Sequence, residues 1–320
     1  MEGKATVYIL RRFLQTSFVL FGVSVVTFLM LHVAPGHPLQ SNPEMRLDPT
    51  AVERWLHLRQ LDRPLFGRYI SWLSRLFRGD FGVSLLYNRP VTELMAERLP
   101  STLLLTVTAF VISLLLAVLI GTYAARYQDS ACARVVNILS IAGNSLPDFW
   151  LGILLVLVFS YKNQLFPAAG MRTPGDGSPA DIARHMVLPL SVMVFANFSY
   201  YVRYVRGAVL AVLKQDFVRA AKSRGLNDRQ LLFRHVLPNA AIPVVTIAAL
   251  SLPMLFTGTM TAEYVFAWPG IGRFIVSSLL ARDYPVVMTV NLYTACLVAL
   301  ANLLADLLYL LIDPRLRVKR

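Results

Sequence analysis

Charged side chains are scarce in this chain of 320 residues: 15% of the residues are charged, whereas 56% are hydrophobic. A soluble globular domain usually has about 25% charged and about 45–50% apolar residues. The shortage is concentrated in six long stretches with almost no charge, at residues 13–45, 99–125, 135–161, 185–202, 235–262 and 284–305. Each can supply the roughly 20 apolar residues that a membrane-spanning helix needs. Helices buried in a soluble core usually keep a polar face, so that alternative is disfavoured. The sequence predicts an all-α membrane protein with six transmembrane helices.

Motifs for catalysis and metal binding are also missing from the sequence. The two cysteines, Cys132 and Cys296, cannot form a disulfide framework. The only Gly-Lys pair, Gly3-Lys4, lacks the upstream glycine of a nucleotide-binding loop. The five histidines are scattered without the spacing of metal ligands, and no nucleophile motif surrounds a serine. We therefore expect no catalytic residue, no metal site and no cofactor in this chain.

The charge that is present is mostly positive, with a formal net charge of +13. Lysine and arginine gather at the N-terminus, after the second stretch, between the fourth and fifth stretches, and in the C-terminal tail. Cytoplasmic segments of membrane proteins are enriched in these residues. This distribution predicts that both termini face the cytoplasm, and it explains the basic composition without a nucleic-acid partner.

The segment between the first two stretches, residues 35–100, has a helical pattern of its own. Large apolar residues recur at roughly helical spacing with arginines between them: Trp55, Leu56, Leu58, Leu61, Leu65, Tyr69, Trp72, Leu73, Leu76 and Phe77. Residues 61–64 mark a break in the pattern. It predicts a helix that lies at the membrane surface or packs against the other helices, and packing is favoured over recognition of a partner. We expect residues 1–100 to form an uncleaved transmembrane anchor with an extracytoplasmic helical segment, and residues 101–320 to form a five-helix core.

The cytoplasmic loop at residues 215–239 predicts two short helices. Asp216 would cap the first helix, and Gly225 would end it in a left-handed turn. The second helix would begin at Asn227. The pair Ala220-Ala221 would form a patch almost without side chains, on which another protein surface can sit closely. The basic residues around the patch suit an acidic groove or, alternatively, anionic lipid head groups.

This loop resembles the EAA motif of permease subunits in ATP-binding-cassette (ABC) importers, in which Glu-Ala-Ala precedes a glycine and an Ile-x-Leu-Pro segment. The residues that match in register are Ala220, Ala221, Gly225, Leu237 and Pro238. Arg219 replaces the glutamate and His235 replaces the isoleucine. The dipeptide/oligopeptide branch of the family is more similar to this version of the motif.

Other segments resemble the same branch, in the same order along the chain. They are Tyr8-Ile-Leu-Arg-Arg12, Ala34-Pro-Gly36, Gly79-Asp-Phe-Gly82, Pro147-Asp-Phe-Trp-Leu-Gly152, Glu263-Tyr-Val-Phe-Ala-Trp-Pro-Gly-Ile-Gly272, Ala281-Arg-Asp-Tyr-Pro285 and Asp313-Pro-Arg315. The resemblance therefore covers nearly the whole chain.

The resemblance implies the type I ABC importer (MetI-like) permease fold in the bacterial cytoplasmic membrane. It also implies partners: a second homologous permease, two cytoplasmic ABC ATPases that bind ATP and Mg, and an extracytoplasmic substrate-binding protein. The loop at residues 215–238, with Arg219 at the variant position, would form the coupling helix that rests in a groove of one ATPase. Di- or oligopeptides are the expected cargo. Nickel chelates, glutathione and oligosaccharides remain alternatives, because the binding protein selects the substrate first.

Candidates for the translocation path are Pro147, Asp148 and Pro253. Prolines kink membrane helices and free backbone carbonyls. A charge at membrane depth costs roughly 2.5–3.5 kcal/mol and usually faces a cavity. Asp148 would therefore face the path and meet a positive group such as a peptide amine. The alternative is a position near the cytoplasmic interface, where this cost nearly vanishes.

Candidates for an outer gate, or for contact with the binding protein, are Glu263, Trp268, Pro269 and Gly270. They belong to the segment that begins the outer loop before the last stretch. Glu263 is expected at the surface, where solvation is the simpler interpretation of its charge.

Two other classes of function remain open at this point. A self-sufficient channel or ion-coupled carrier would transport without ATPase subunits, and the loop at residues 215–238 argues against it. A membrane-anchored structural or sensory subunit would keep normal uptake after a bulky residue replaced Gly225, whereas a coupling helix would lose it.

Overall fold

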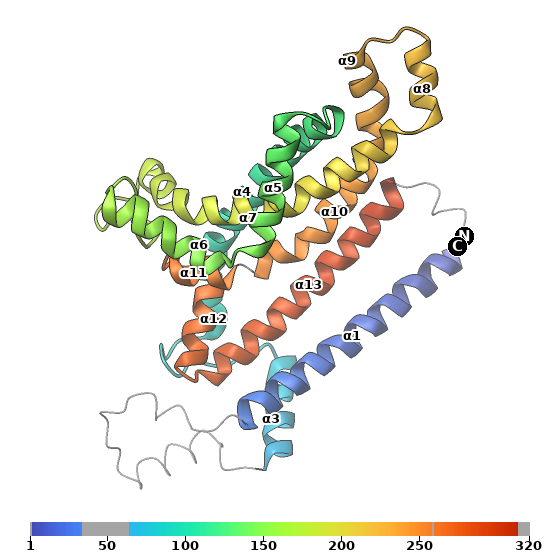
Figure 1. Cartoon of the computed structure of the whole chain (residues 1–320). Coiled ribbons are helices and arrows are strands. Elements are labelled where there is room, and N and C mark those ends of the chain that lie inside the picture. The colour runs from blue at the N-terminus through green and yellow to red at the C-terminus, as the bar shows by residue number, and fades with distance from the viewer. Residues whose placement is uncertain (1, 34–63, 258, 313–320) are drawn as a thin grey trace. The chain divides into compact units, whose positions relative to one another are not determined.

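The computed structural model describes residues 2–33, 64–257 and 259–312, which are almost entirely helical (Figure 1). In chain order the helices are α1 (Glu2–Val33), α3 (Leu65–Phe77), α4 (Val91–Arg126), α5 (Ala131–Ser145), α6 (Asp148–Leu155), the π-helix η2 (Val156–Lys162), α7 (Pro179–Leu213), α8 (Asp216–Ser223), α9 (Asp228–Leu231), the π-helix η3 (Leu232–Val236), α10 (Leu237–Thr257), α11 (Met260–Val265), α12 (Ile271–Leu280) and α13 (Tyr284–Ile312). The expected helical residues Trp55, Leu56, Leu58 and Leu61, and the motifs at 34–36 and 313–315, lie outside the described residues. The all-α prediction is confirmed.

Among the described residues, 5 helices are long and apolar enough to cross a membrane, and 6 if one bent pair counts as a single span. The five spans lie in α1, α4, α7, the run from α9 to α11, and α13. The bent pair is α5 with α6–η2, which covers the third predicted stretch. The predicted six spans are therefore confirmed in this form.

The bend between α5 and α6 is 104°. Pro147 lies at the break, where its own backbone and that of Leu146 are extended. Proline has no backbone N–H for a helical hydrogen bond and disfavours helical geometry in the residue before it. The sequence predicted a kink at Pro147, and the structure shows that the span is broken there.

The chain divides into two compact units. Residues 1–100 and 273–299 belong to the first unit, and residues 101–272 and 300–320 belong to the second. The predicted division into an N-terminal segment (1–100) and a core (101–320) stays a prediction.

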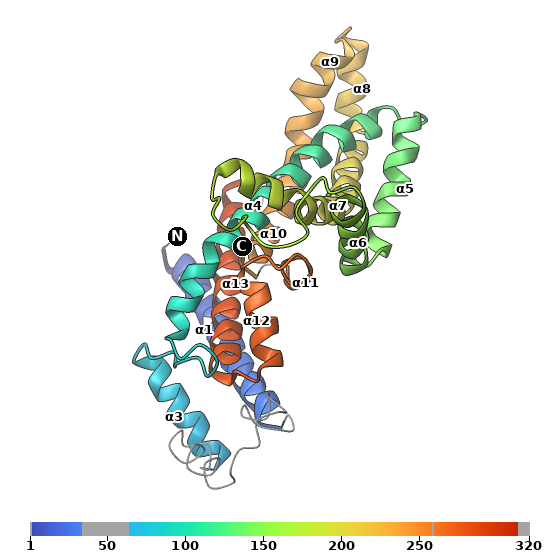
Figure 2. The same ribbon diagram turned by 90° about the vertical axis from the view of Figure 1, so that its left-hand side faces the viewer.

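Within the second unit, α5 and α7 lie next to each other (Figures 1 and 2). They approach closely because Gly143 has no side chain: a β carbon there would overlap the hydroxyl of Ser199. Gly121 of α4 is constrained less severely, since its β carbon would lie 3.2 Å from a methyl group of Val205 in α7. Small residues at such crossings let helices gain van der Waals contact, which drives helix association in lipid.

Within the first unit, α3 packs against α1 with one side only. The hydroxyls of Tyr69 and Ser24 are hydrogen-bonded at 2.8 Å, and the Tyr69 ring meets the edge of Phe28 at 5.2 Å between centroids. No residue of α3 is buried, and Phe66 and Phe77 are 77% and 84% exposed. This contact agrees with the predicted packing, although α3 keeps part of its apolar surface exposed.

A buried carboxylate also organises the first unit. Asp283, in the turn before α13, is fully buried and accepts a hydrogen bond from the Ser84 hydroxyl. It also accepts the backbone N–H groups of Leu85 at 3.0 Å and Leu86 at 3.2 Å. These bonds fix the loop before α4. A β carbon at Gly82 would lie 3.5 Å from that of Pro285, so the segments 79–82 and 281–285, which both resemble the permease family, lie against each other in this unit.

Candidate functional site

The loop at residues 215–239 forms a hairpin of α8 and α9 at one end of the second unit (Figures 1 and 2). Gly225 follows α8 with φ +84°, the predicted left-handed turn. Asn227 begins α9 as predicted: its side chain accepts the Gln230 N–H at 2.8 Å, and Gln230 bonds back to form a capping box. The prediction that Asp216 caps α8 is wrong. Gln215 holds that position, and Asp216 is the first helical residue, where its charge suits the positive helix end.

Only one of the paired alanines faces outward. Ala221 and Val218, three residues apart, are 8% and 4% exposed and pack into the core of the second unit. Ala220 is exposed, as is Arg219. The predicted patch of two alanines is therefore wrong, because the helical period turns Ala221 toward the core. The outward surface of the hairpin is basic and carries Arg219, Lys222, Arg224 and Arg229.

Two connections join the hairpin to the spans. Arg126, at the end of α4, donates to the Asp228 carboxylate at 2.8 Å. On the other side, η3 leads without a break into α10, and the Leu237 N–H bonds to the Leu232 carbonyl, five residues earlier. Pro238, the last residue of the predicted motif, is exposed in the first turn of α10. The hairpin is therefore a helical extension of α10.

The candidates for the translocation path lie in two different environments. Pro147 and Asp148 are exposed at the break between α5 and α6, whereas Pro253 is buried inside α10. Among the described residues, no hydrogen bond or ion pair reaches the Asp148 carboxylate. The 15 residues of α5 separate it from the loop at residues 127–130, which corresponds to about 22 Å of helix. This distance disfavours the alternative position at the cytoplasmic interface.

The expected surface position of Glu263 is wrong, because Glu263 is 0% exposed. Its carboxylate accepts the hydroxyl of Thr102 in α4 at 2.9 Å. The same hydroxyl oxygen accepts the Ile271 N–H at 2.8 Å. A β carbon at Gly270 would overlap the Glu263 carboxylate, and Gly272 is similarly enclosed. The buried carboxylate and Thr102 thus hold the turn between α11 and α12 against α4.

Trp268 and Gly270 are also buried, so they are not available for the expected surface contact. The Trp268 indole N–H donates to the Ser101 carbonyl at 2.8 Å. Pro269, between them, is exposed. Contact with a binding protein therefore stays a prediction for Pro269 alone, and a role of this segment as an outer gate also stays a prediction. The side chains of Glu263 and Trp268, together with Gly270, organise the turn from within.

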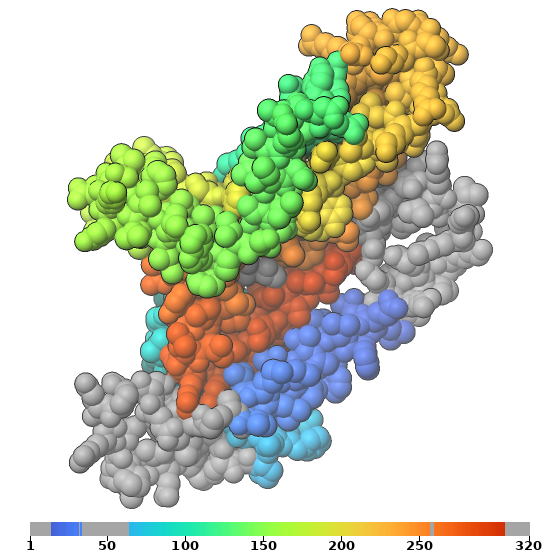
Figure 3. Space-filling view, in the orientation of Figure 1, coloured from blue at the N-terminus to red at the C-terminus, as the bar shows by residue number. Residues whose placement is uncertain are grey.

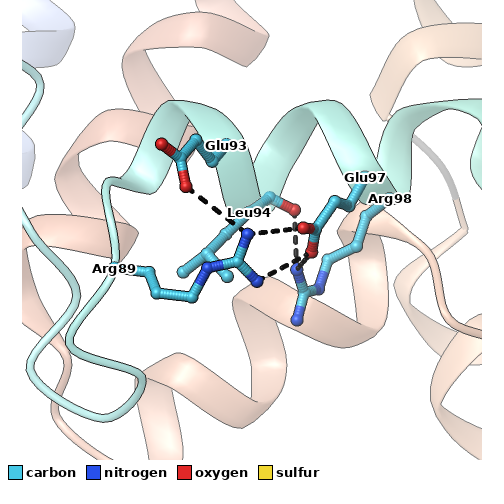
Figure 4. Close-up of polar contacts among 5 residues, drawn as sticks. All are labelled: Arg89, Glu93, Leu94, Glu97 and Arg98. Carbon is cyan, nitrogen blue, oxygen red and sulfur yellow. Dashed lines mark hydrogen bonds and ion pairs between the residues drawn. The ribbon is translucent and has the colours of Figure 1, made fainter.

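The sequence did not single out a charged cluster at the start of α4 in the first unit (Figure 4). Arg89 donates to Glu97 at 3.2 Å and to Glu93 at 3.4 Å, and Arg98 donates to the Leu94 carbonyl at 2.7 Å. The hydrogen bond from Arg89 to the Glu97 carboxylate raises the pKa of the Arg89 guanidinium above its ordinary value. Water screens ion pairs between exposed side chains such as these, so this cluster secures the first turns of α4 only weakly.

Comparison with known proteins gives results for nearly the whole chain. Residues 117–318 match the family described as "Binding-protein-dependent transport system inner membrane component", and residues 6–106 match its N-terminal counterpart, "Binding-prot-dependent transport system membrane comp, N-term". The chain is 34% identical over 311 residues to the oligopeptide transport system permease protein AppB of Bacillus subtilis. The aligned residues cover 97% of this chain and 98% of that protein. It is 34% identical over 320 residues to the di/tripeptide transport system permease protein DppB of Pseudomonas aeruginosa, with coverage of 94% and 95%.

A solved structure of the MetNI methionine ABC transporter in an inward-facing conformation has a similar fold. The TM-score is 0.52 at 16% identity, over 69% of this chain and 97% of that chain. The fold is that of the MetI-like permeases of ABC importers. The chain belongs to the family of binding-protein-dependent transport system inner membrane components. It is a multi-pass protein of the bacterial inner membrane, and its family works with ATPase and substrate-binding partners.

Proposed function

We propose that this chain moves di- or oligopeptides inward across the membrane, driven by ATP hydrolysis in partner subunits. The observation that carries the proposal is the α8–α9 hairpin, which projects from the second unit (Figure 3). Its exposed surface carries the basic residues named above. Relatives named as oligopeptide and di/tripeptide permeases match the chain over nearly its whole length, which supports a peptide cargo.

The working complex would contain a second homologous permease, two ABC ATPases and an extracytoplasmic binding protein. ATP and Mg would be bound by the ATPases, and this chain would be non-catalytic. When the ATPases close on ATP, they would move the hairpin, and hydrolysis would reset it. Pro269, at the outer side, would meet the binding protein.

The hairpin is built to transmit such a movement. Val218 and Ala221 anchor α8 in the core, Arg126 ties the start of α9 to α4, and η3 makes the hairpin continuous with α10. Closely packed elements shift between discrete arrangements instead of deforming continuously. A displacement of the exposed surface around Ala220 would therefore pass into the spans.

Gly225 gives the test of this coupling. Its φ of +84° is strained for a residue with a β carbon, at about 1–2 kcal/mol, and asparagine tolerates it better than valine does. The complete complex would be reconstituted in liposomes, and ATP-dependent peptide uptake would be measured. We expect Gly225→Val to reduce uptake by roughly 5- to 30-fold, the factor that corresponds to this strain, and Gly225→Asn to retain most of it.

A matched control is Gly207→Val in α7, where the added side chain meets open space and ordinary helical backbone. It should leave uptake within about twofold. Normal uptake by Gly225→Val would contradict the coupling role and favour an anchored structural subunit. Transport by the purified chain without ATPases would establish a carrier or channel instead. Uptake of a nickel chelate, glutathione or an oligosaccharide, but of no peptide, would refute the cargo and leave the coupling intact.

A further inference from the structure

The break between α5 and α6 exposes a carboxylate inside a membrane-spanning segment. Asp148 is the first residue of α6, and the described residues supply no partner for it. The residues beside it, Phe149 and Trp150, are 52% and 48% exposed. A buried partner within the second unit therefore does not explain why an acid stands in this apolar stretch.

The two sides of α6 differ in what they contact. One side packs inside the second unit: Leu151 and Leu155 lie in a cluster with Phe266 and Leu188, and Gly152 lies against Phe266. The other side carries exposed apolar residues suited to lipid: Trp150, Ile153, Leu154 and Leu157.

Asp148 lies on the side that packs. It precedes Leu151, Gly152 and Leu155 by three, four and seven residues, which is the spacing of one helix face. The carboxylate is therefore exposed where that packed side begins, and it points away from the lipid-facing arc. An ionised side chain in a membrane segment normally faces the bundle interior or a water-filled cavity, and this geometry agrees with that rule.

We propose that Asp148 is a cation-binding position of the translocation path and that it receives the ammonium group of a peptide. This inference rests on the proposed function, because it takes a peptide as the cargo. The break leaves this carboxylate accessible: the helix turns by 104° before α6, so no preceding helical turn continues over Asp148, the first residue of α6. A carboxylate there offers a charge-assisted hydrogen bond to a passing ammonium group.

The first test asks whether Asp148 faces water. Cys132 and Cys296 are the only cysteines in the chain, so Cys132→Ser with Cys296→Ser gives a background free of thiols. In that background, Asp148→Cys and the control Trp150→Cys would be placed in the complete complex in lipid nanodiscs. A membrane-impermeant, positively charged methanethiosulfonate reagent would then be added.

We expect Asp148→Cys to react at least tenfold faster than Trp150→Cys, because only position 148 would face the aqueous path. An excess of peptide-loaded binding protein with ATP should slow the reaction. Equal rates at the two positions, or no reaction at position 148, would overturn the proposal.

The second test asks whether Asp148 favours transport of peptides that carry a positive N-terminal ammonium group. A tripeptide with a free N-terminus and its N-acetylated form would each be loaded on the binding protein beforehand. Turnover would be measured in proteoliposomes at a saturating concentration of loaded binding protein, so that differences in how tightly the binding protein holds the two tripeptides do not affect the comparison. Asp148→Asn should reduce turnover of the free tripeptide on the order of tenfold, the effect of losing a charged hydrogen-bond partner. It should change turnover of the acetylated tripeptide much less, and Asp148→Glu should retain the preference.

Asp129→Asn is the matched control, because it removes an exposed carboxylate from the loop before α5. It should leave both turnovers unchanged. If Asp148→Asn left both turnovers unchanged, or lowered both equally, the proposal would be refuted. If the wild-type complex imported neither tripeptide, the proposed peptide cargo would fail, whereas the accessibility test would still decide whether Asp148 faces the path.

Discussion

Thr102→Val tests the buried arrangement around Glu263. The Thr102 hydroxyl donates to the Glu263 carboxylate at 2.9 Å and accepts the Ile271 N–H at 2.8 Å, and both Thr102 and Glu263 are 0% exposed. Valine has nearly the same shape but neither donates nor accepts. The substitution would therefore remove one bond to a carboxylate and leave one backbone N–H buried without its partner.

The expected loss can be worked out from these two bonds. A hydrogen bond to a charged group contributes about 1.5–3 kcal/mol, and a buried unsatisfied group costs about 1–3 kcal/mol. Thr102→Val should thus destabilise the chain by about 2.5–6 kcal/mol. Thr102→Ser keeps the hydroxyl and loses one methyl group, at about 0.8 kcal/mol. The difference between the two variants isolates the hydroxyl.

The measurement is the midpoint of thermal inactivation of the purified complex, followed by loss of the assembled peak in size-exclusion chromatography. At about 2–4 °C per kcal/mol, the valine variant should melt at least about 3 °C below the serine variant. Midpoints within about 1 °C of each other would refute the reasoning, since they would mean that the hydroxyl contributes nothing to the α4–α11 contact.

The remaining predictions concern two other buried contacts. Asp283→Asn should destabilise the first unit by about 2–4 kcal/mol, because the substitution removes the charge and replaces one acceptor oxygen by an NH2 group, which then faces at least one backbone N–H. Limited proteolysis of the loop before α4 should become faster, and an unchanged rate would contradict this. Gly143→Ala should cost about 1–3 kcal/mol, since its β carbon would overlap Ser199. Ser199→Gly removes the overlapping hydroxyl, so the double variant should recover most of the fall in thermal midpoint caused by Gly143→Ala. If the double variant instead lost the sum of the two single effects, the overlap would be contradicted.

The positions of the spans could be predicted because lipid imposes one rule on every apolar stretch. A stretch such as residues 99–125 must be helical, and its length follows from the bilayer. Gly225 was predictable for a similar reason, since a left-handed turn after a helix has a local residue preference. In both cases the determining physics lies within a few residues of the chain.

The contacts that organise the candidate site are not local, and the sequence could not reveal them. Glu263 looks like a surface acid until Thr102, 161 residues earlier, is placed beside it. The only signal at Thr102 was a polar residue at the start of an apolar stretch. Ala221 was misplaced for a smaller reason: the sequence gives the helical period but not which side of α8 meets the core.

The separation between Thr102 and Glu263 also bears on how the chain is made. At roughly 5–20 residues per second, the 161 residues between them take about 8–30 s to synthesise. For most of that interval α4 (Val91–Arg126) is already complete, while the acceptor for its Thr102 hydroxyl and the donor for its Ser101 carbonyl do not yet exist. The outer end of α4 can therefore reach its final packing only after α11 and the following turn have left the ribosome. Insertion and completion of this part of the permease are thus separate events in its biogenesis.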